Sequence, residues 1–157
     1  MKKFMLAAAA VAALGSQYAA PAQAQSAYDD TQVLLSQIQT DRRAIVLKGL
    51  DLTDEEVTKF TPIYDEYQRE HKALAQNYLD VINKFAANYD SMTDDAAKSI
   101  MKDWFKVVDE RTALTKKYAK RFEKAMPSTK VMRWVQIENK LSALTNYESA
   151  RIIPLTK

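Results

Sequence analysis

Apolar residues recur every three or four positions over residues 57–85, which is the period of an amphipathic α-helix. The stripe consists of Val57, Phe60, Tyr64, Tyr67, His71, Leu74, Tyr78, Val81 and Phe85. Thr53 stands three residues before Glu56, with Leu52 ahead of it, so we predict a capping box at the helix start. We expect the helix to bend at Pro62 but not to end there, because the stripe continues in register beyond it.

The same pattern occurs a second time further along the chain. Thr93 takes the place of Thr53, and Ala96 takes that of Glu56, so the second cap lacks the reciprocal glutamate. The matching pairs are Phe60 with Ile100, Tyr64 with Trp104, Tyr67 with Val107, Leu74 with Leu114, Tyr78 with Tyr118 and Ile82 with Phe122. We therefore predict a second long helix that starts at this second threonine and ends by Pro127, as another copy of one helical unit.

Two further helices are predicted, one on each side of this pair in the sequence. The first covers about residues 30–48, with Gly49 as its C′ residue. Its apolar positions are Leu34, Leu35, Ile38, Ile45 and Val46. The last covers residues 131–152, with Ser128 or Thr129 as its cap. Its shared apolar face consists of Trp134, Ile137, Leu141 and Leu144.

The composition favours helices and excludes several kinds of site. The chain has no cysteine, so thiol catalysis and thiolate metal sites are excluded. It has only two glycines, which leaves no glycine-rich phosphate loop and few of the turns that a β-protein needs. We predict a single all-α domain of four helices over residues 25–157. Its expected core includes Phe60, Tyr64, Leu74, Trp104, Leu114, Phe122, Trp134 and Leu141.

The first residues have the pattern of a cleavable secretory signal peptide, which covers residues 1–24. Two lysines at positions 2 and 3 precede an apolar run over residues 4–14, and Ala-Gln-Ala at 22–24 forms a small-residue cleavage site. Cleavage between Ala24 and Gln25 would lower the formal net charge of +3 by two. The alternative, a membrane anchor, needs about 20 apolar residues, and this run is shorter. We therefore expect an exported protein without a transmembrane segment after signal removal and without a nucleic-acid partner.

Two short segments, Leu52-Thr53-Asp54-Glu55-Glu56 and Met92-Thr93-Asp94-Asp95-Ala96, resemble the LTxxQ signature of periplasmic proteins of the Spy/CpxP type. Glu56 and Ala96 stand where that signature has glutamine. The segment Gln136-Ile137-Glu138-Asn139-Lys140 is also similar to one in relatives of the family. The resemblance implies a bent antiparallel helical hairpin that dimerises into a cradle in the periplasm.

The resemblance also implies a function: an ATP-independent, chaperone-like protein of the envelope-stress type, which binds unfolded or envelope proteins. Two alternatives remain open. The chain could be a regulatory ligand for the periplasmic domain of an envelope-stress sensor kinase, or a purely structural envelope protein. A chaperone would suppress the aggregation of unrelated unfolded proteins, a regulator would bind one sensor domain, and a structural protein would do neither.

We expect no catalytic residue, no metal ligand and no cofactor. His71 is the only histidine, and tetrahedral zinc usually takes several His or Cys ligands, so a structural histidine is the favoured interpretation. Any Ser-His-acid arrangement would have to use this same mid-helix histidine. Paired acids such as Asp94 and Asp95 stand in a first helical turn, where the helix dipole explains them.

A basic surface is predicted near the end of the second long helix, formed by Lys116, Lys117, Lys120, Arg121 and Lys124. It complements the negative end of the helix dipole, and contact with anionic lipid or an acidic client is the alternative. The candidate surface for a client or a second copy of the chain is aromatic, with Tyr64, Tyr67, Tyr78, Trp104 and Tyr118. A thin hairpin has too little interior to bury every such residue.

His71 and Arg111 occupy equivalent places in the two repeats, and each interrupts an apolar stripe. If the chain reverses around residues 89–91, the two side chains should lie within about one helical turn of each other. Asp109 and Glu110 would then be near enough to pair with either of them. Two cations side by side in a core are costly, so we expect a polar layer in which His71 is neutral or open to water.

Overall fold

The computed structural model describes Asp29, Val33 and residues 42–156. The expected signal peptide, its cleavage site at Ala24 and Gln25, and the apolar positions Leu34, Leu35 and Ile38 lie outside the described residues. Within residues 42–156 every regular element is a helix, and there is no strand. The all-α fold with four helices is confirmed.

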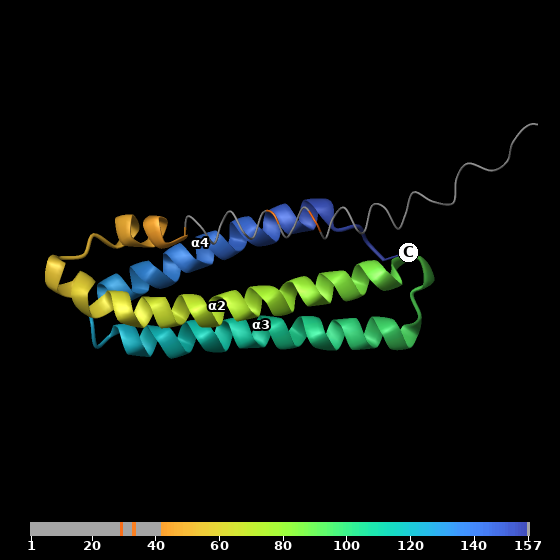
Figure 1. The fold of residues 1–157 in the computed structure, drawn as a ribbon, viewed down its shortest axis with the longest axis horizontal. Coiled ribbons are helices and arrows are strands. Elements are labelled where there is room, and N and C mark those ends of the chain that lie inside the picture. Colours follow the sequence, from red (N-terminus) through yellow and green to blue (C-terminus); the bar gives the residue numbers. More distant parts are fainter. Residues whose placement is uncertain (1–28, 30–32, 34–41, 157) are drawn as a thin grey trace, which may run out of the picture.

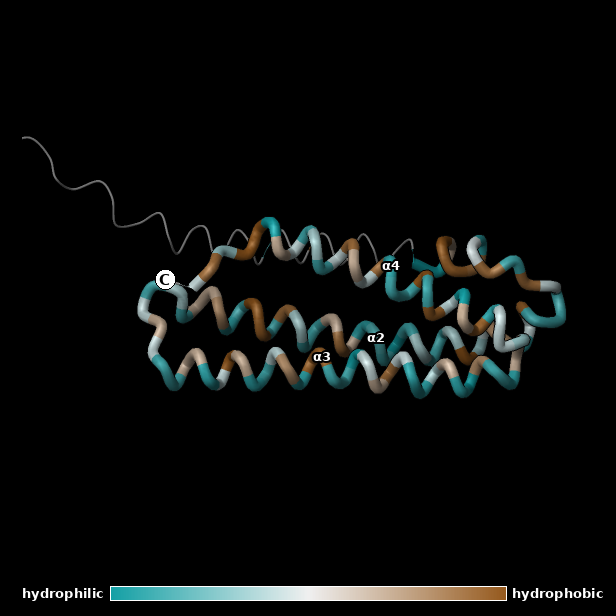
Figure 2. Tube along the Cα trace, turned by 180° about the vertical axis from the view of Figure 1, so that it is seen from behind, coloured by the Kyte–Doolittle hydropathy of each residue, from teal (hydrophilic) through white to brown (hydrophobic). Residues whose placement is uncertain are grey.

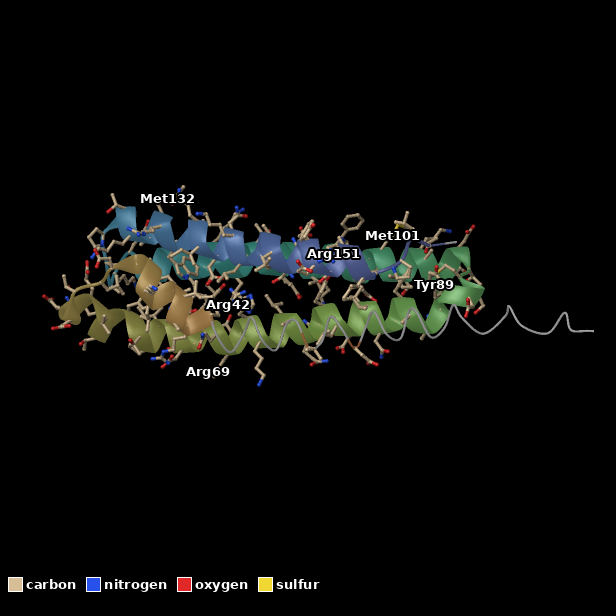
Figure 3. All side chains as sticks on the ribbon, turned by 90° about the horizontal axis from the view of Figure 1, so that it is seen from above. Arg42, Arg69, Tyr89, Met101, Met132 and Arg151 are labelled. Carbon is tan, nitrogen blue, oxygen red and sulfur yellow. The ribbon has the colours of Figure 1, made fainter. Side chains whose placement is uncertain are left out.

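Asp29 and Val33 are also helical, and within residues 42–156 the order is helix 42–50, α2 (Asp54–Asn88), the short 3₁₀ helix η1 (Tyr89–Ser91), α3 (Asp94–Phe122) and α4 (Ser128–Ile152). The helices α2 and α3 lie side by side and antiparallel along their whole length (Figure 1). Helix 42–50 lies above the start of α2, and α4 lies above α3 (Figure 3). The chain therefore forms two layers of helices.

The helix starts follow the predicted caps in α2 and α3. The Thr53 backbone N–H donates to Glu56 Oε2 at 2.8 Å, and Glu56 N–H donates to Thr53 Oγ1 at 3.3 Å, which completes the capping box. In the second copy, Ala96 N–H donates to Thr93 Oγ1 at 3.2 Å. The helix α2 runs through Pro62 without ending, as expected.

The predicted cap of α4 is wrong. Ser128 and Thr129 both lie inside the first turn, and Pro127 occupies the N-cap position without any side-chain cap. Its carbonyl oxygen accepts from the N–H groups of Lys130 and Val131 at 2.9 and 3.1 Å. A proline fits here because its fixed φ suits a helix entrance and a hydroxyl cap is not obligatory.

Gly49 does not end the first helix, which was its predicted role. The helix continues to Leu50, and the left-handed residue is Asp51, with a φ of 50°. Aspartate tolerates this region because its short side chain can hydrogen-bond locally. A Cβ atom on Gly49 would lie only 2.6 Å from Ile137 Cδ1. The glycine therefore permits close packing of helix 42–50 against α4.

The core has two parts along the bundle. The larger part contains Val46, Leu50, Phe60, Tyr64, Tyr67, Leu114, Tyr118, Phe122, Met126, Val131, Trp134 and Leu141. The smaller part contains Tyr78, Leu79, Val81, Ile82 and Val107. Most of the expected core is confirmed, but Leu74 is only partly buried and Trp104 is exposed. Hydrophobic and hydrophilic residues alternate along α3, as its amphipathic period requires (Figure 2).

The buried face of α4 differs from the predicted one. Leu144 is exposed, although Trp134 and Leu141 are buried as expected. The face turned to the bundle consists of Val131, Trp134, Glu138, Leu141, Thr145 and Ser149. Three members of this face, Glu138, Thr145 and Ser149, are polar. Apolar periodicity places polar residues on the surface, and this is why Leu144 was predicted to be buried in their place.

Candidate functional site

A buried ionic network joins three helices. Arg42 of helix 42–50 donates through Nη1 to Glu138 Oε2 of α4, and Tyr67 Oη of α2 donates to the same oxygen at 2.7 Å. Only 5 % of the Arg42 side chain and 4 % of the Glu138 side chain are exposed. Arg42 reaches from its helix toward the middle of the bundle (Figure 3). Burial raises the pKa of the Glu138 carboxyl, and the Arg42 charge opposes that rise.

Beside this network is a cavity of about 590 Å³, lined by side chains of α2, α3 and α4. His71 and Arg111 both lie on its wall, together with Glu138. Burial, followed by the charges of Arg42 and Arg111, lowers the pKa of His71 to about 3, so the imidazole is neutral at neutral pH. Its ring centroid lies 5.6 Å from that of Tyr67.

Arg111 has weak partners for a cation in this position. Its Nη1 donates to Asn146 Oδ1 at 3.2 Å, and its guanidinium carbon lies 5.8 Å from the centroid of the Tyr78 ring. None of the carboxylates in the described part of the chain pairs with it. Burial lowers the pKa of Arg111, and the nearby Arg42 charge adds to that effect.

The structure places the predicted polar pair, His71 and Arg111, on one cavity wall, but the acids are different from those expected. Glu110 Oε1 lies 3.8 Å from Lys106 Nζ, and Asp109 is exposed without a bond to either member of the pair. The carboxylate that lies on the same cavity wall as His71 and Arg111 is Glu138. Its position, at heptad-like spacing between Trp134 and Leu141, is the sequence signal that could have identified it.

The predicted aromatic surface is mostly internal. Tyr64, Tyr67, Tyr78 and Tyr118 are all buried, and only Trp104, at 41 % exposure, reaches the surface. The reason is the second layer of helices, which covers the pair formed by α2 and α3. In that interior, the Tyr67 ring makes edge-to-face contacts at 5.2 Å with Trp134 and at 5.2 Å with Tyr118.

A different apolar surface lies on an exposed face of α3. We call it the α3 strip, and it consists of Met101, Trp104, Phe105 and Val108. Their spacing of three and four residues places them on one face of the helix. Phe105 is 63 % exposed and Met101 is 52 % exposed. Trp104 was predicted as part of a client surface, but Met101, Phe105 and Val108 were not, because they lie outside the apolar stripe that matches the first repeat.

The predicted basic surface is partly neutralised by α2. Lys117 Nζ lies 2.7 Å from Glu70 Oε1, and Arg121 Nη1 lies 2.7 Å from Glu66 Oε2. These ion pairs tie α3 to α2 and reduce the positive charge available for a partner. Lys116 is different, because it lies on the wall of the cavity and has no ion pair among the described residues.

Residues 42–156, with Asp29 and Val33, contain no group of three or more His, Cys, Asp or Glu side chains that could hold a metal ion. No helix in this part of the chain has the length and apolar character needed to cross a membrane. Comparison with known protein families, with curated protein sequences and with solved structures gave no match. The resemblance to the Spy/CpxP type therefore stays a prediction, based on the motif copies at Thr53 and Thr93 and on the segment 136–140.

Proposed function

We propose that the chain is a periplasmic, ATP-independent, client-binding protein that holds apolar segments of unfolded proteins on the α3 strip. The exposed apolar residues of this strip are the observation that carries the proposal. Exposed side chains as large as Trp104 and Phe105 on one helix face are typical of an interaction surface. Methionine and aromatic side chains adapt to varied partners, because methionine is flexible and aromatic rings offer broad contact area.

Contacts with α2 hold in place the part of α3 that carries the strip. Lys84 Nζ of α2 lies 2.7 Å from Asp103 Oδ2, and the Tyr78 and Trp104 rings lie 5.6 Å apart. A client would therefore meet a preformed surface and would not have to order it first, which lowers the cost of binding.

An aggregation assay with a chemically denatured client tests this proposal. The purified chain should slow aggregation without ATP, and the double variant Met101→Ser with Phe105→Ser should lose most of that effect. Two exposed apolar contacts of this size contribute together about 1 to 3 kcal/mol, or roughly a 5- to 150-fold change in affinity. Ile45→Ser is the matched control, because Ile45 is 44 % exposed but lies on helix 42–50.

Other results would support the alternative functions. Tight binding to a single sensor domain, without any effect on denatured clients, would favour a regulatory ligand. No binding to either would favour a structural envelope protein. The homodimer implied by the resemblance would have to use surfaces other than the four buried tyrosines. A stable dimer that dissociates in the Met101→Ser, Phe105→Ser variant would make the α3 strip an interface between copies, and the client proposal would then be wrong.

A further inference from the structure

The cavity between α3 and α4 has unequal numbers of positive and negative groups on its wall. Among the described residues Glu138 is the one carboxylate on this wall, and its Oε2 atom already accepts from Arg42 and Tyr67. The negative charge of Glu138 is therefore matched by Arg42. Arg111 and Lys116 lie on the same wall, and neither forms an ion pair within the part of the chain that the structure describes. Two cations are left without an anion.

The positive charge of Arg111 is the more consequential of the two because it is partly buried. A guanidinium taken out of water is strongly stabilised by an anion that accepts two of its N–H groups. Here the side chain has only one hydrogen bond, to an amide oxygen of Asn146, and a distant aromatic ring. Its remaining donors are available to a ligand in the cavity.

The rest of the wall restricts the chemical class of that ligand. The wall has apolar side chains from both helices: Val108 and Leu114 lie within one helical turn of Arg111 on α3, and Met132 and Val135 of α4 lie further along the wall. A volume of about 590 Å³ is in the range of sites that hold small organic molecules. The wall also has hydroxyl and amide groups, but its apolar side chains favour an anion with an apolar body over a fully hydrated ion such as inorganic phosphate.

We propose that this cavity binds a small organic acid, with its carboxylate on Arg111 and its apolar body against neighbouring apolar side chains of the wall, Val108 and Leu114. Lys116 lies on the same wall as a second positive charge that attracts the anion. This site binds an anion through Arg111, whereas the α3 strip binds apolar segments. Anion binding therefore does not depend on the proposed chaperone activity. Val108 belongs to both the α3 strip and the cavity wall. The aggregation assay therefore uses Met101→Ser with Phe105→Ser and leaves Val108 unchanged.

Titration with octanoate, followed by NMR of the Arg111 side chain and the His71 ring, tests the proposal. Octanoate should bind saturably, and the neutral octanamide should bind at least about tenfold more weakly because it lacks the charge. The bound carboxylate should also raise the pKa of His71, since it offsets the Arg111 charge that now lowers it. Inorganic phosphate is the second probe and should bind more weakly than octanoate.

Variants separate the role of Arg111 from general positive charge. Arg111→Gln should weaken octanoate binding at least about tenfold, whereas Lys120→Gln, a basic residue of α3 outside the cavity wall, should leave it unchanged. If Arg111→Gln fails to fold, Val108→Asp provides a second test. Val108 is 44 % exposed and stands one helical turn from Arg111, so the new carboxylate should occupy the guanidinium and block octanoate.

The proposal is overturned if octanoate does not bind, if octanamide or phosphate binds equally well, or if binding survives both Arg111→Gln and Val108→Asp. None of these outcomes affects the aggregation assay with the Met101→Ser, Phe105→Ser variant. The two proposals can therefore fail independently.

Discussion

Arg42 and Glu138 form an ion pair inside the bundle, although 96 positions separate them in the sequence and 5 % and 4 % of their side chains are exposed. The pair connects helix 42–50 to α4, and Tyr67 extends it to α2. Two atoms of the pair, Arg42 Nε and Glu138 Oε1, have no hydrogen-bond partner in the described structure. Removing both charges from water costs about as much free energy as the ion pair gains, so such a pair adds little net stability. Its main effect is to specify which helix faces pack together.

We predict that Glu138→Leu alone destabilises the chain by about 3 to 5 kcal/mol, because it leaves the Arg42 guanidinium buried without a partner. The double variant Arg42→Met with Glu138→Leu should recover most of that loss or exceed the wild type, since no charge is then buried. Urea unfolding measures both values. A double variant as unstable as the single one would mean that the ion pair itself is essential to the fold.

The lowered pKa of His71 should make the stability of the folded chain depend on pH. This pKa is about 3 in the folded chain against an ordinary value of 6.5, so the unfolded state binds more protons between these values. The free energy of unfolding should therefore fall as the pH drops from about 6.5 toward 3. Relative to pH 7, we expect His71 to account for a loss of about 1 to 2 kcal/mol at pH 4, after allowance for solvent screening.

The charged groups around His71 determine the control for this measurement. Arg42 from helix 42–50 and Arg111 from α3 lower its pKa, and Glu138 from α4 lines the same cavity. Because the pKa of Glu138 is raised, protonation of that group favours the folded state and acts in the opposite direction. Both chains in a comparison of wild type with His71→Leu retain Glu138, so the difference between their pH profiles isolates His71. Identical profiles between pH 4 and 7 would refute the assignment.

Gly49 offers a test of close packing. Gly49→Ala should gain about 0.5 to 1 kcal/mol from helix propensity, but its Cβ atom would approach Ile137 Cδ1 to 2.6 Å. We expect these effects to offset each other in the wild type. In an Ile137→Val background, which lacks that Cδ1 atom, the same substitution should stabilise the chain by the full amount. Thermal unfolding of the four chains in this cycle measures the coupling, and simple additivity would contradict the contact.

The two helix caps differ by one residue, and this difference can be repaired. Thr53 has the reciprocal Glu56, whereas Thr93 has Ala96 in that position. Ala96→Glu should complete a capping box in α3 and stabilise the chain by about 0.3 to 1.5 kcal/mol. Thr93→Ala is the matched opposite, with an expected loss of about 1 kcal/mol. A chain with Ala96→Glu that is no more stable than Thr93→Ala would exclude the cap as a source of stability.

The elements that could be predicted from sequence are those whose signals are local. The capping pairs at Thr53 and Thr93 and the apolar stripe of α2 identified the long helices, because cap chemistry and helical period depend on nearby residues. The residue at which helix 42–50 ends could not be predicted from such local signals. Gly49 has the residue type of a C′ position, but its place is fixed by contact with Ile137, which is remote in sequence.

The candidate site could be predicted only in part for the same reason. Repeat equivalence placed His71 and Arg111 together, since both lie on the two longest helices. Glu138 was not assigned to that layer, because its spacing between Trp134 and Leu141 can place it on the inner face but does not identify Arg42, on another helix, as its partner. The internal position of Tyr64 and Tyr118 likewise follows from the second layer of helices, whose packing a periodic pattern does not specify.

A photo-crosslinking residue introduced at position 105 tests most directly whether unfolded proteins bind the α3 strip. Phe105 is 63 % exposed, so the replacement should not disturb the fold, and the same residue at position 45 is the control. We predict crosslinks from position 105 to a denatured client, few from position 45, and none to the same client in its native state. Equal crosslinking from both positions, or none from position 105, would contradict the claim.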